Sequence, residues 1–269
     1  MKNAFGRRNY LWPSLAVLIL AVILFVKYLL TDQKPGDQKT ASVTAPLLKP
    51  SKQGEGLVAY WSFDEGQGTV AKDCSGKGNE GRINGPQWIK LNKGYALEFD
   101  GKDDFVDCGN GESLNLGKGD FTISFWKFQT RENPPCPVLS DGERDDSQNS
   151  WYIEFYPGTI NVSFRYGGIC QGTEKWKTIG FTGCYKWEQI AVVRDVVKLE
   201  VRIYIDGDLK YTYFPIKVVD VRDHKSLLIG SDRRYGAFKG TLDEIRIYNM
   251  ALNEKAIKEL YRGDINDEE

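Results

Sequence analysis

Two short stretches at opposite ends of the chain most constrain its fold. Residues 57–66 read LVAYWSFDEG, and residues 240–249 read GTLDEIRIYN. Each stretch alternates apolar and polar side chains, as a strand with one buried face does, and each carries an Asp-Glu pair. Strands of this kind can pair although they are far apart in sequence. The pattern therefore predicts that the two stretches lie side by side and close a β-sandwich.

Short alternating runs separated by turn residues fill the sequence between these stretches. Asp206-Gly207 gives a strong hairpin signal between residues 201–205 and 210–214. Many short strands with no long helices between them predict an all-β fold of antiparallel sheets. The predicted strands are 57–63, 96–99, 104–108, 121–128, 151–156, 160–166, 188–193, 200–205, 227–230 and 242–248.

The amino-terminal region has a different composition from the rest of the chain. Residues 11–30 are predominantly apolar and carry no charge except at Lys27, and about 20 such residues span a bilayer as a helix. Basic residues precede this run, and no small-residue cleavage site follows it directly. We expect residues 1–10 to form a cytoplasmic tail, 11–30 an uncleaved transmembrane signal anchor and 31–56 a flexible linker. A removed signal peptide is the alternative.

The remainder is expected to be extracytoplasmic, either periplasmic or extracellular, which makes this a single-pass membrane protein. We expect one domain over residues 57–262, with a short helix at 254–261 that Asn253 caps and Gly263 stops. Residues 263–269 are expected to form an acidic tail. From residue 57 onward the net charge is −6, which disfavours nucleic acid as a partner.

Seven segments are similar to those of a known family. They are YWSFDEG at 60–66, DCSGKGNEG at 73–81, ALEFDGKDDFV at 96–106, FTISFW at 121–126, WEQIAVVR at 187–194, YIDG at 204–207 and GTLDEIRIY at 240–248. In this order they resemble the laminin-G-like jelly-roll family of the concanavalin A-like lectin/glucanase superfamily. The resemblance implies a two-sheet antiparallel jelly-roll sandwich. Relatives serve as sugar-binding modules, adhesion domains, pentraxin-like lectins and appendages of hydrolases, so the fold alone does not select a function.

Calcium is a candidate cofactor, since some relatives bind it near the first and last strands. Asp64, Asp73, Asn79 and Asp243 offer the oxygen ligands that Ca²⁺ prefers. The alternative is that Asp64 and Asp243 bind loop backbone, while Asp73 and Asn79 shape a turn.

A glycan is the candidate ligand, because exposed aromatic rings flanked by polar groups bind sugars. The departures from the family pattern at 133–149 and 167–177 are loops of the kind that carry specificity. The candidate contacts are Trp176, Tyr166, Trp151 and Arg165. A structural role for each is the alternative.

The chain has five cysteines, and an exported domain permits disulfides. Cys170 and Cys184 flank the Trp176 segment, so a bridge between them would stiffen it. Cys136 is a competing partner, and Cys74 with Cys108 is another possible pair.

Catalysis is not expected. Glu98 and Asp100 begin the Glu-x-Asp-x-x-Glu pattern of glucanases, but the glutamate that completes it is missing. Asp103 and Asp104 are interpreted as solvated loop charges. We therefore expect a non-catalytic module that recognises a glycan or another component of the cell envelope or extracellular matrix. The alternatives are a protein–protein adhesion or scaffold domain and a divergent glycoside hydrolase.

Overall fold

The computed structural model describes residues 54–268 except for short internal segments. These segments are 131–135, 142–149, 157–158, 167–168, 173–182, 216, 223–224 and 233–235. The predicted anchor at 11–30 and most of the predicted linker lie outside the described residues. Within the described part, no helix has the length and apolar character needed to span a bilayer.

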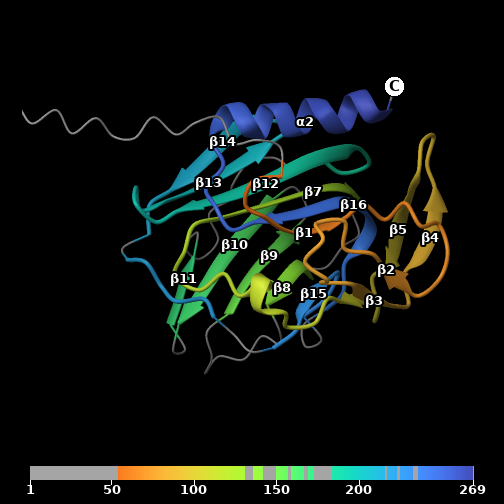
Figure 1. The fold of residues 1–269 in the computed structure, drawn as a ribbon, viewed down its shortest axis with the longest axis horizontal. Helices are drawn as coiled ribbons and strands as arrows, with labels where there is room; N and C mark the ends of the chain where they lie inside the picture. Colours follow the sequence, from red (N-terminus) through yellow and green to blue (C-terminus); the bar gives the residue numbers. More distant parts are fainter. Residues whose placement is uncertain are drawn as a thin grey trace, which may run out of the picture. The chain divides into compact units, whose positions relative to one another are not determined.

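The described residues form two antiparallel sheets (Figure 1). The first sheet contains β1 (Leu57–Trp61), β4 (Gln87–Lys90), β5 (Tyr95–Asp100), β7 (Phe121–Gln129), β12 (Trp187–Asp195), β13 (Glu200–Ile205), β14 (Asp208–Tyr213) and β16 (Lys239–Tyr248). Its order is β14-β13-β12-β7-β16-β5-β4, and β1 also pairs with β16.

The second sheet contains β2 (Val70–Ala71), β3 (Gly81–Asn84), β6 (Phe105–Asp107), β8 (Cys136–Asp141), β9 (Ser150–Tyr156), β10 (Thr159–Tyr166), β11 (Ile169–Gly172) and β15 (Leu227–Ile229). Its order is β11-β10-β9-β8-β15-β6-β3-β2. A short 3₁₀ helix, η1 (Glu112–Leu114), and one α-helix, α2 (Glu254–Glu268), complete the described elements. The predicted jelly-roll sandwich is confirmed.

The core lies between the two sheets because alternate residues of facing strands are apolar. On β7 and β9, for example, Phe125 and Phe155 pack edge to face with their ring centroids 6.2 Å apart. Phe121 contacts Trp151 in the same layer. Burying a side chain of this size contributes about 1.5–3 kcal/mol relative to leaving it in water, so the facing rows hold the sheets together.

The predicted meeting of the chain's two ends is confirmed. β1 runs antiparallel to β16, with Tyr60 opposite Arg246 and Trp61 opposite Ile245. Trp61 is fully buried, and its indole N–H donates a 2.8 Å hydrogen bond to the carbonyl oxygen of Asn79.

The carboxy-terminal helix covers part of the outer face of the first sheet (Figure 1). The Ala256 amide donates to Asn253 Oδ1 over 2.9 Å, so the predicted cap is confirmed. The prediction that the helix stops at Gly263 is wrong, because α2 continues to Glu268. Gly263 does not adopt the positive φ that ends a helix.

Five strands were not predicted, namely β2, β3, β4, β8 and β11. Most are short, and β8 lies inside the segment that we interpreted as a loop at 133–149. It begins CPVLSD, and proline is unusual inside a sheet. The pairing of β8 with β9 shifts register between Pro137 and Leu139, and an irregularity of this kind accommodates proline.

Candidate functional site

One end of the sandwich gathers charged side chains. There β5 and β7 end and β12 and β16 begin, with Lys239 opposite Asp100 and Gly240 opposite Gln129. The second sheet reaches the same end, since Lys127 Nζ lies 5.4 Å from the ring centroid of Phe155 near the end of β9. We call this end the rim and define it by residues 100–104, 127–129 and 183–188.

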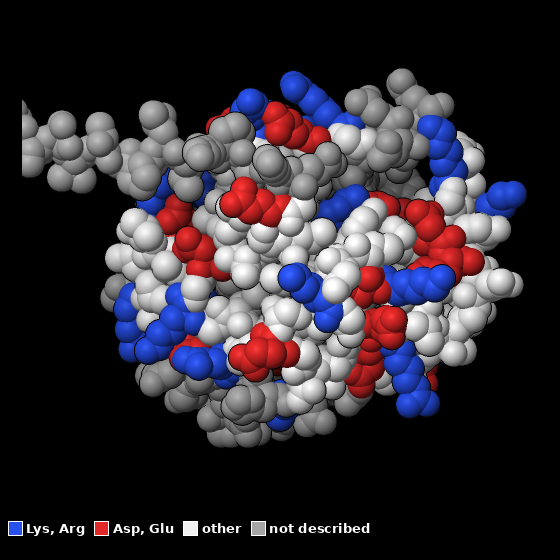
Figure 2. All heavy atoms as spheres, in the orientation of Figure 1, with Lys and Arg blue, Asp and Glu red and all other residues white. Residues whose placement is uncertain are grey.

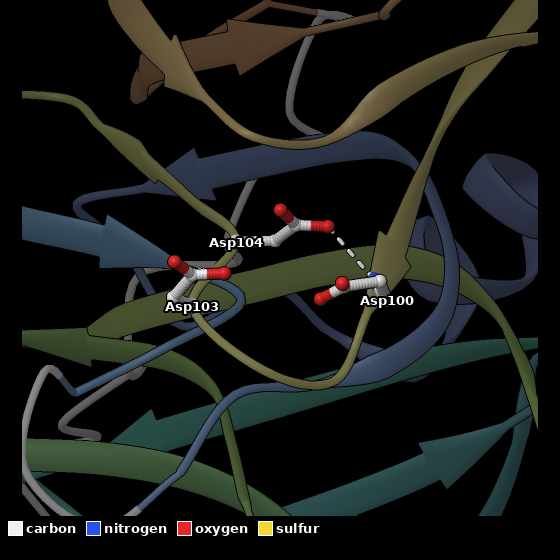
Figure 3. Close-up of side chains that lie close together, drawn as sticks. All are labelled: Asp100, Asp103 and Asp104. Atoms are coloured by element: carbon white, nitrogen blue, oxygen red, sulfur yellow. Dashed lines mark hydrogen bonds between the residues drawn. The ribbon is translucent and has the colours of Figure 1, made fainter.

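The first part of the rim is an acidic turn that follows β5 (Figure 3). The Asp100 amide donates to Asp104 Oδ2 over 2.7 Å, and the Lys102 amide donates to Asp100 Oδ1 over 2.8 Å. One carboxylate oxygen from each of Asp100, Asp103 and Asp104 lies within 4.8 Å of the others. Among the described residues, this is the group of acidic side chains with a spacing that suits a cation.

Asp104 differs from the other two carboxylates because it is buried. Burial raises its pKa, and the charges of Asp100 and Asp103 raise it further against the opposing hydrogen bond from the Asp100 amide. In Asp100, hydrogen bonds from Lys102 lower the pKa. The interpretation of Asp104 as a solvated charge is therefore wrong. A side chain at Gly85 would collide with Asp104 Oδ1. The backbone of Gly85 therefore lies directly against this carboxylate and helps to bury it.

The second part of the rim is a buried ion pair between the sheets. Lys127 Nζ lies 2.9 Å from Glu188 Oε2, with the two side chains 0% and 1% exposed. The same two groups bind the backbone of Gly183, whose carbonyl accepts from Lys127 Nζ over 2.6 Å and whose amide donates to Glu188 Oε2 over 2.7 Å. The pair thus fixes the end of the connection from β11 to β12.

Each partner of this pair has a lowered pKa, for different reasons. Burial lowers the pKa of Lys127, and its bond to Glu188 opposes this shift. Burial would raise the pKa of Glu188, but hydrogen bonds from Lys186, Lys127 and Gly183 outweigh it. Glu188 therefore stays ionised at neutral pH.

Tyr185 is the rim residue that sequence reasoning missed. Its side chain is 59% exposed, and its backbone has a φ of 59°, which is uncommon for a residue other than glycine. The Tyr185 amide donates to the carbonyl oxygen of Gln129 over 2.8 Å, so tertiary contacts hold this conformation. Strained residues of this kind cluster at functional sites. The available signal was an aromatic residue in a polar segment directly before a predicted strand.

Asp73 and Asn79, two of the predicted calcium ligands, lie together in one loop. Asp73 Oδ1 accepts from the amides of Tyr60 and Ser75 over 3.0 and 2.9 Å, and its Oδ2 accepts from the Asn79 amide over 2.9 Å. Asn79 Nδ2 donates to the carbonyl oxygen of Val58 over 2.8 Å. These bonds correspond to the turn-shaping alternative.

The other two predicted calcium ligands lie elsewhere. Asp64 is exposed and its Oδ1 accepts from the Tyr95 amide over 3.2 Å. Asp243 is buried on β16, where its Oδ1 accepts from the Glu244 amide over 3.0 Å. Within the described part of the chain, no group of metal-binding spacing combines Asp64, Asp73 and Asp243.

The predicted glycan contacts are only partly described. Trp151 is 2% exposed and belongs to the core, so its ring is not available at the surface. Arg165 and Tyr166 lie on β10, where Arg165 pairs with Ser150 and Cys170, but their side chains are outside the described part. Trp176 lies outside the described residues altogether.

The predicted disulfide does not form in the structure, because Cys184 is a free thiol. Cys170 lies on the edge strand β11 of the second sheet, whereas Cys184 precedes β12 in the first sheet. Cys74 and Cys108 are also free thiols, so the alternative bridge between them is absent as well.

Comparison with known families agrees with this architecture. Residues 100–258 match the sequence model of a laminin-G group described as the concanavalin A-like lectin/glucanases superfamily. The chain therefore belongs to this superfamily. No curated protein was found to match the chain.

Solved structures with the same fold include binding domains of larger proteins. The binding domain of Paraclostridial Mosquitocidal Protein 1 aligns with a TM-score of 0.64 and 19% identity, over 80% of this chain and 54% of that one. The receptor binding domain of botulinum neurotoxin D gives a TM-score of 0.63 and 17% identity, over 80% and 54%. The chain thus spans about half the length of these toxin domains.

A third similar structure is matched over nearly its whole length. Domain 4 of AbnA, an extracellular arabinanase of Geobacillus stearothermophilus in complex with arabinotriose, gives a TM-score of 0.61 and 20% identity. The alignment covers 76% of this chain and 98% of that domain. At these identities the likeness shows the fold.

Proposed function

We propose that this protein is a non-catalytic recognition module that binds a glycan at the rim. The observation that carries the proposal is the exposed ring of Tyr185 beside Lys186, whose side chain is also exposed. Sugar C–H faces stack on aromatic rings, and sugar hydroxyls need charged or polar partners close by. The acidic turn and Lys186 would supply such partners.

The buried pair of Lys127 and Glu188 would serve this site by positioning it. The two residues hold Gly183, two residues before Tyr185 and at the end of the segment that contains Trp176. A preorganised loop loses less conformational entropy on binding. Trp176, which lies outside the described residues, stays a second proposed contact on the grounds of its sequence.

The comparisons support a binding role at the level of the superfamily. One similar domain was solved with an arabinose oligosaccharide and others are toxin binding domains. The proposal extends this to a glycan ligand for the present chain, held at an envelope or matrix by the amino-terminal anchor.

The proposal includes calcium as a ligand of the acidic turn. Three carboxylates within 4.8 Å fit a hard cation that takes oxygen ligands, although Lys102 Nζ competes for Asp100 at 3.1 Å. The ion would order this turn, which belongs to the same rim as Tyr185.

A glycan array probed with the full chain, with and without Ca²⁺, tests the proposal. Tyr185→Ala should weaken binding to the best glycan roughly 30-fold, as loss of an aromatic anchor does. Phe214→Ala is the matched control, because Phe214 is similarly exposed but lies at the opposite end of the first sheet. An array without hits, together with capture of one envelope protein, would instead favour the adhesion alternative. Release of reducing sugar from a polysaccharide would contradict the non-catalytic reading.

A further inference from the structure

The end of the first sheet opposite the rim exposes a group of apolar side chains. Val197 and Leu199 lie in the connection from β12 to β13, and Phe214 follows β14 directly. Val197 is 87% and Phe214 66% exposed, and Leu199 is exposed as well. Val201 pairs with Tyr213, which brings the two connections to one corner. We call Val197, Leu199 and Phe214, with Lys198 and Lys217, the apolar corner.

The charges around the apolar corner are arranged with the cations outermost. Lys198 Nζ lies 3.1 Å from Asp195 Oδ2, and the lysine side chain is 60% exposed whereas the aspartate is 10% exposed. Arg222 and Asp220 repeat this arrangement with a 2.8 Å contact and 54% against 14% exposure. Lys217 is also exposed. Figure 2 shows Lys and Arg spheres interspersed with Asp and Glu spheres on one face of the molecule. At the corner the cations are the more exposed members of their ion pairs, so they are the charges nearest to a binding partner.

The amino-terminal region joins the domain at this same end. Leu57 pairs with Tyr248, Tyr248 with Thr122 and Thr122 with Val193. This row crosses the sheet close to where β12 ends at Asp195. The described chain therefore begins at the same end of the first sheet as the apolar corner and away from the rim, with β16, β7 and β12 between β1 and β13.

We propose that the apolar corner docks on the surface of an anionic lipid bilayer and orients the rim away from it. Apolar side chains that protrude between lysines insert at the boundary between headgroups and acyl chains, while the ammonium groups bind anionic headgroups. The position of the chain entry explains why this end meets the membrane. The inference is independent of what the rim binds.

Amide hydrogen exchange of the full chain on vesicles tests this inference. The exchange rate is measured residue by residue, so docking of the corner is distinguished from membrane attachment through residues 11–30. The amides of residues 196–199 and 217–219 should exchange more slowly on phosphatidylcholine vesicles containing phosphatidylglycerol than on phosphatidylcholine alone. The double variant Lys198→Gln, Lys217→Gln should lower the ratio of docked to undocked protein, which the protection of these amides reports, roughly 30-fold. Each lysine near an anionic surface raises that ratio about fivefold. A triple change to serine at Val197, Leu199 and Phe214 should abolish the protection.

Leu209→Ser is the matched control, because Leu209 is exposed on the same strand β14 but near the rim. It should keep the protection. Exposed substitutions of this kind leave folding nearly unchanged, and thermal unfolding checks this. Equal exchange on both vesicle types, or protection that survives the triple change, overturns the inference. Protection that appears without lipid and rises with protein concentration would assign the corner to a second copy of the chain and would also overturn it.

Discussion

The hydroxyl of Tyr60 donates a 2.8 Å hydrogen bond to Glu244 Oε2, although the two residues are 184 positions apart in the chain. Arg246 completes the contact, since its Nη2 donates to the Tyr60 hydroxyl over 3.1 Å and it forms an ion pair with Glu244. Its guanidinium carbon lies 4.2 Å from the centroid of the Tyr60 ring. The first and last strands are therefore joined through side chains as well as backbone.

Tyr60→Phe should lower the free energy of unfolding by about 1 kcal/mol, the usual net value of such hydrogen bonds. The ring remains, so the stacking of Arg246 is retained. Tyr60→Leu removes both interactions and should cost more. Urea unfolding at neutral pH measures both, and an unchanged midpoint for Tyr60→Phe would show that the hydroxyl contributes nothing.

Lys127→Met should lower the free energy of unfolding by about 1.5–3 kcal/mol, the usual value of a hydrogen bond to a charged group. It removes one partner of the buried Glu188 carboxylate, which keeps Lys186 and the Gly183 amide. The control is Lys198→Met, which removes an exposed ion pair and should cost at most about 1 kcal/mol. If the two variants lose equal stability by urea unfolding, the buried pair is no more important than a surface one.

Asp73 should contribute to acid sensitivity. Burial alone would raise its pKa, but hydrogen bonds from Ser75, Asn79 and Tyr60 outweigh this and lower the pKa. Because the folded pKa lies below the unfolded value of about 3.9, the stabilisation is complete above that value and is lost as the pH falls through the folded pKa.

Asp73→Asn should therefore destabilise the protein at pH 7, by roughly 1–2 kcal/mol for the weakened hydrogen bonds. It should also flatten the loss of stability below about pH 4. Asp103→Asn is the control, since Asp103 is an exposed aspartate. An acid unfolding curve that keeps its slope in Asp73→Asn would exclude this role.

The thiols should differ in reactivity. Burial raises the pKa of Cys108 well above its usual range, and the charges of Asp107 and Asp73 add to the shift, whereas Cys74 is exposed. Native alkylation with iodoacetamide followed by mass spectrometry should label Cys74 fully before Cys108 reacts, because the thiolate is the nucleophile. Absence of label on Cys74 before reduction would instead reveal a disulfide.

Calcium should raise the melting temperature if the acidic turn binds it. With a Kd of about 10⁻⁴–10⁻³ M, typical of extracellular modules, 10 mM Ca²⁺ would add roughly 1.4–2.7 kcal/mol. Asp103→Asn should remove this response and Asp243→Asn should keep it, as calorimetry with and without chelator can measure. The reverse outcome would return the site to the ligands proposed from sequence, and no response in the unmodified protein would exclude calcium.

The fold was predictable because local patterns carry it. Period-two alternation sets which face of a strand is buried, and this placed β1, β7, β12 and β16 near their observed positions. Glycine and aspartate marked the hairpin between β13 and β14. The short strands β2, β3, β4 and β11, and the proline-containing β8, were missed because such segments have weak alternation and depend on neighbours for pairing.

The site was less predictable, because exposure depends on the whole fold. The sequence offered Trp151 as a surface ring, yet the second sheet turns it into the core beside Phe121. Tyr185, which lies in a polar segment before a predicted strand, stays exposed. Trp176 remains a prediction.

The sequence by itself determined the individual strands and turns, because backbone periodicity and turn chemistry are local properties. Its resemblance to the laminin-G-like family supplied the two-sheet sandwich that these strands form. Only the tertiary structure decided which polar groups meet. Asp104 became buried, Lys127 reached Glu188 and three carboxylates converged, since each contact depends on the register of strands that are distant in sequence. That register fixes distances of a few ångströms, on which hydrogen bonding and charge interactions depend.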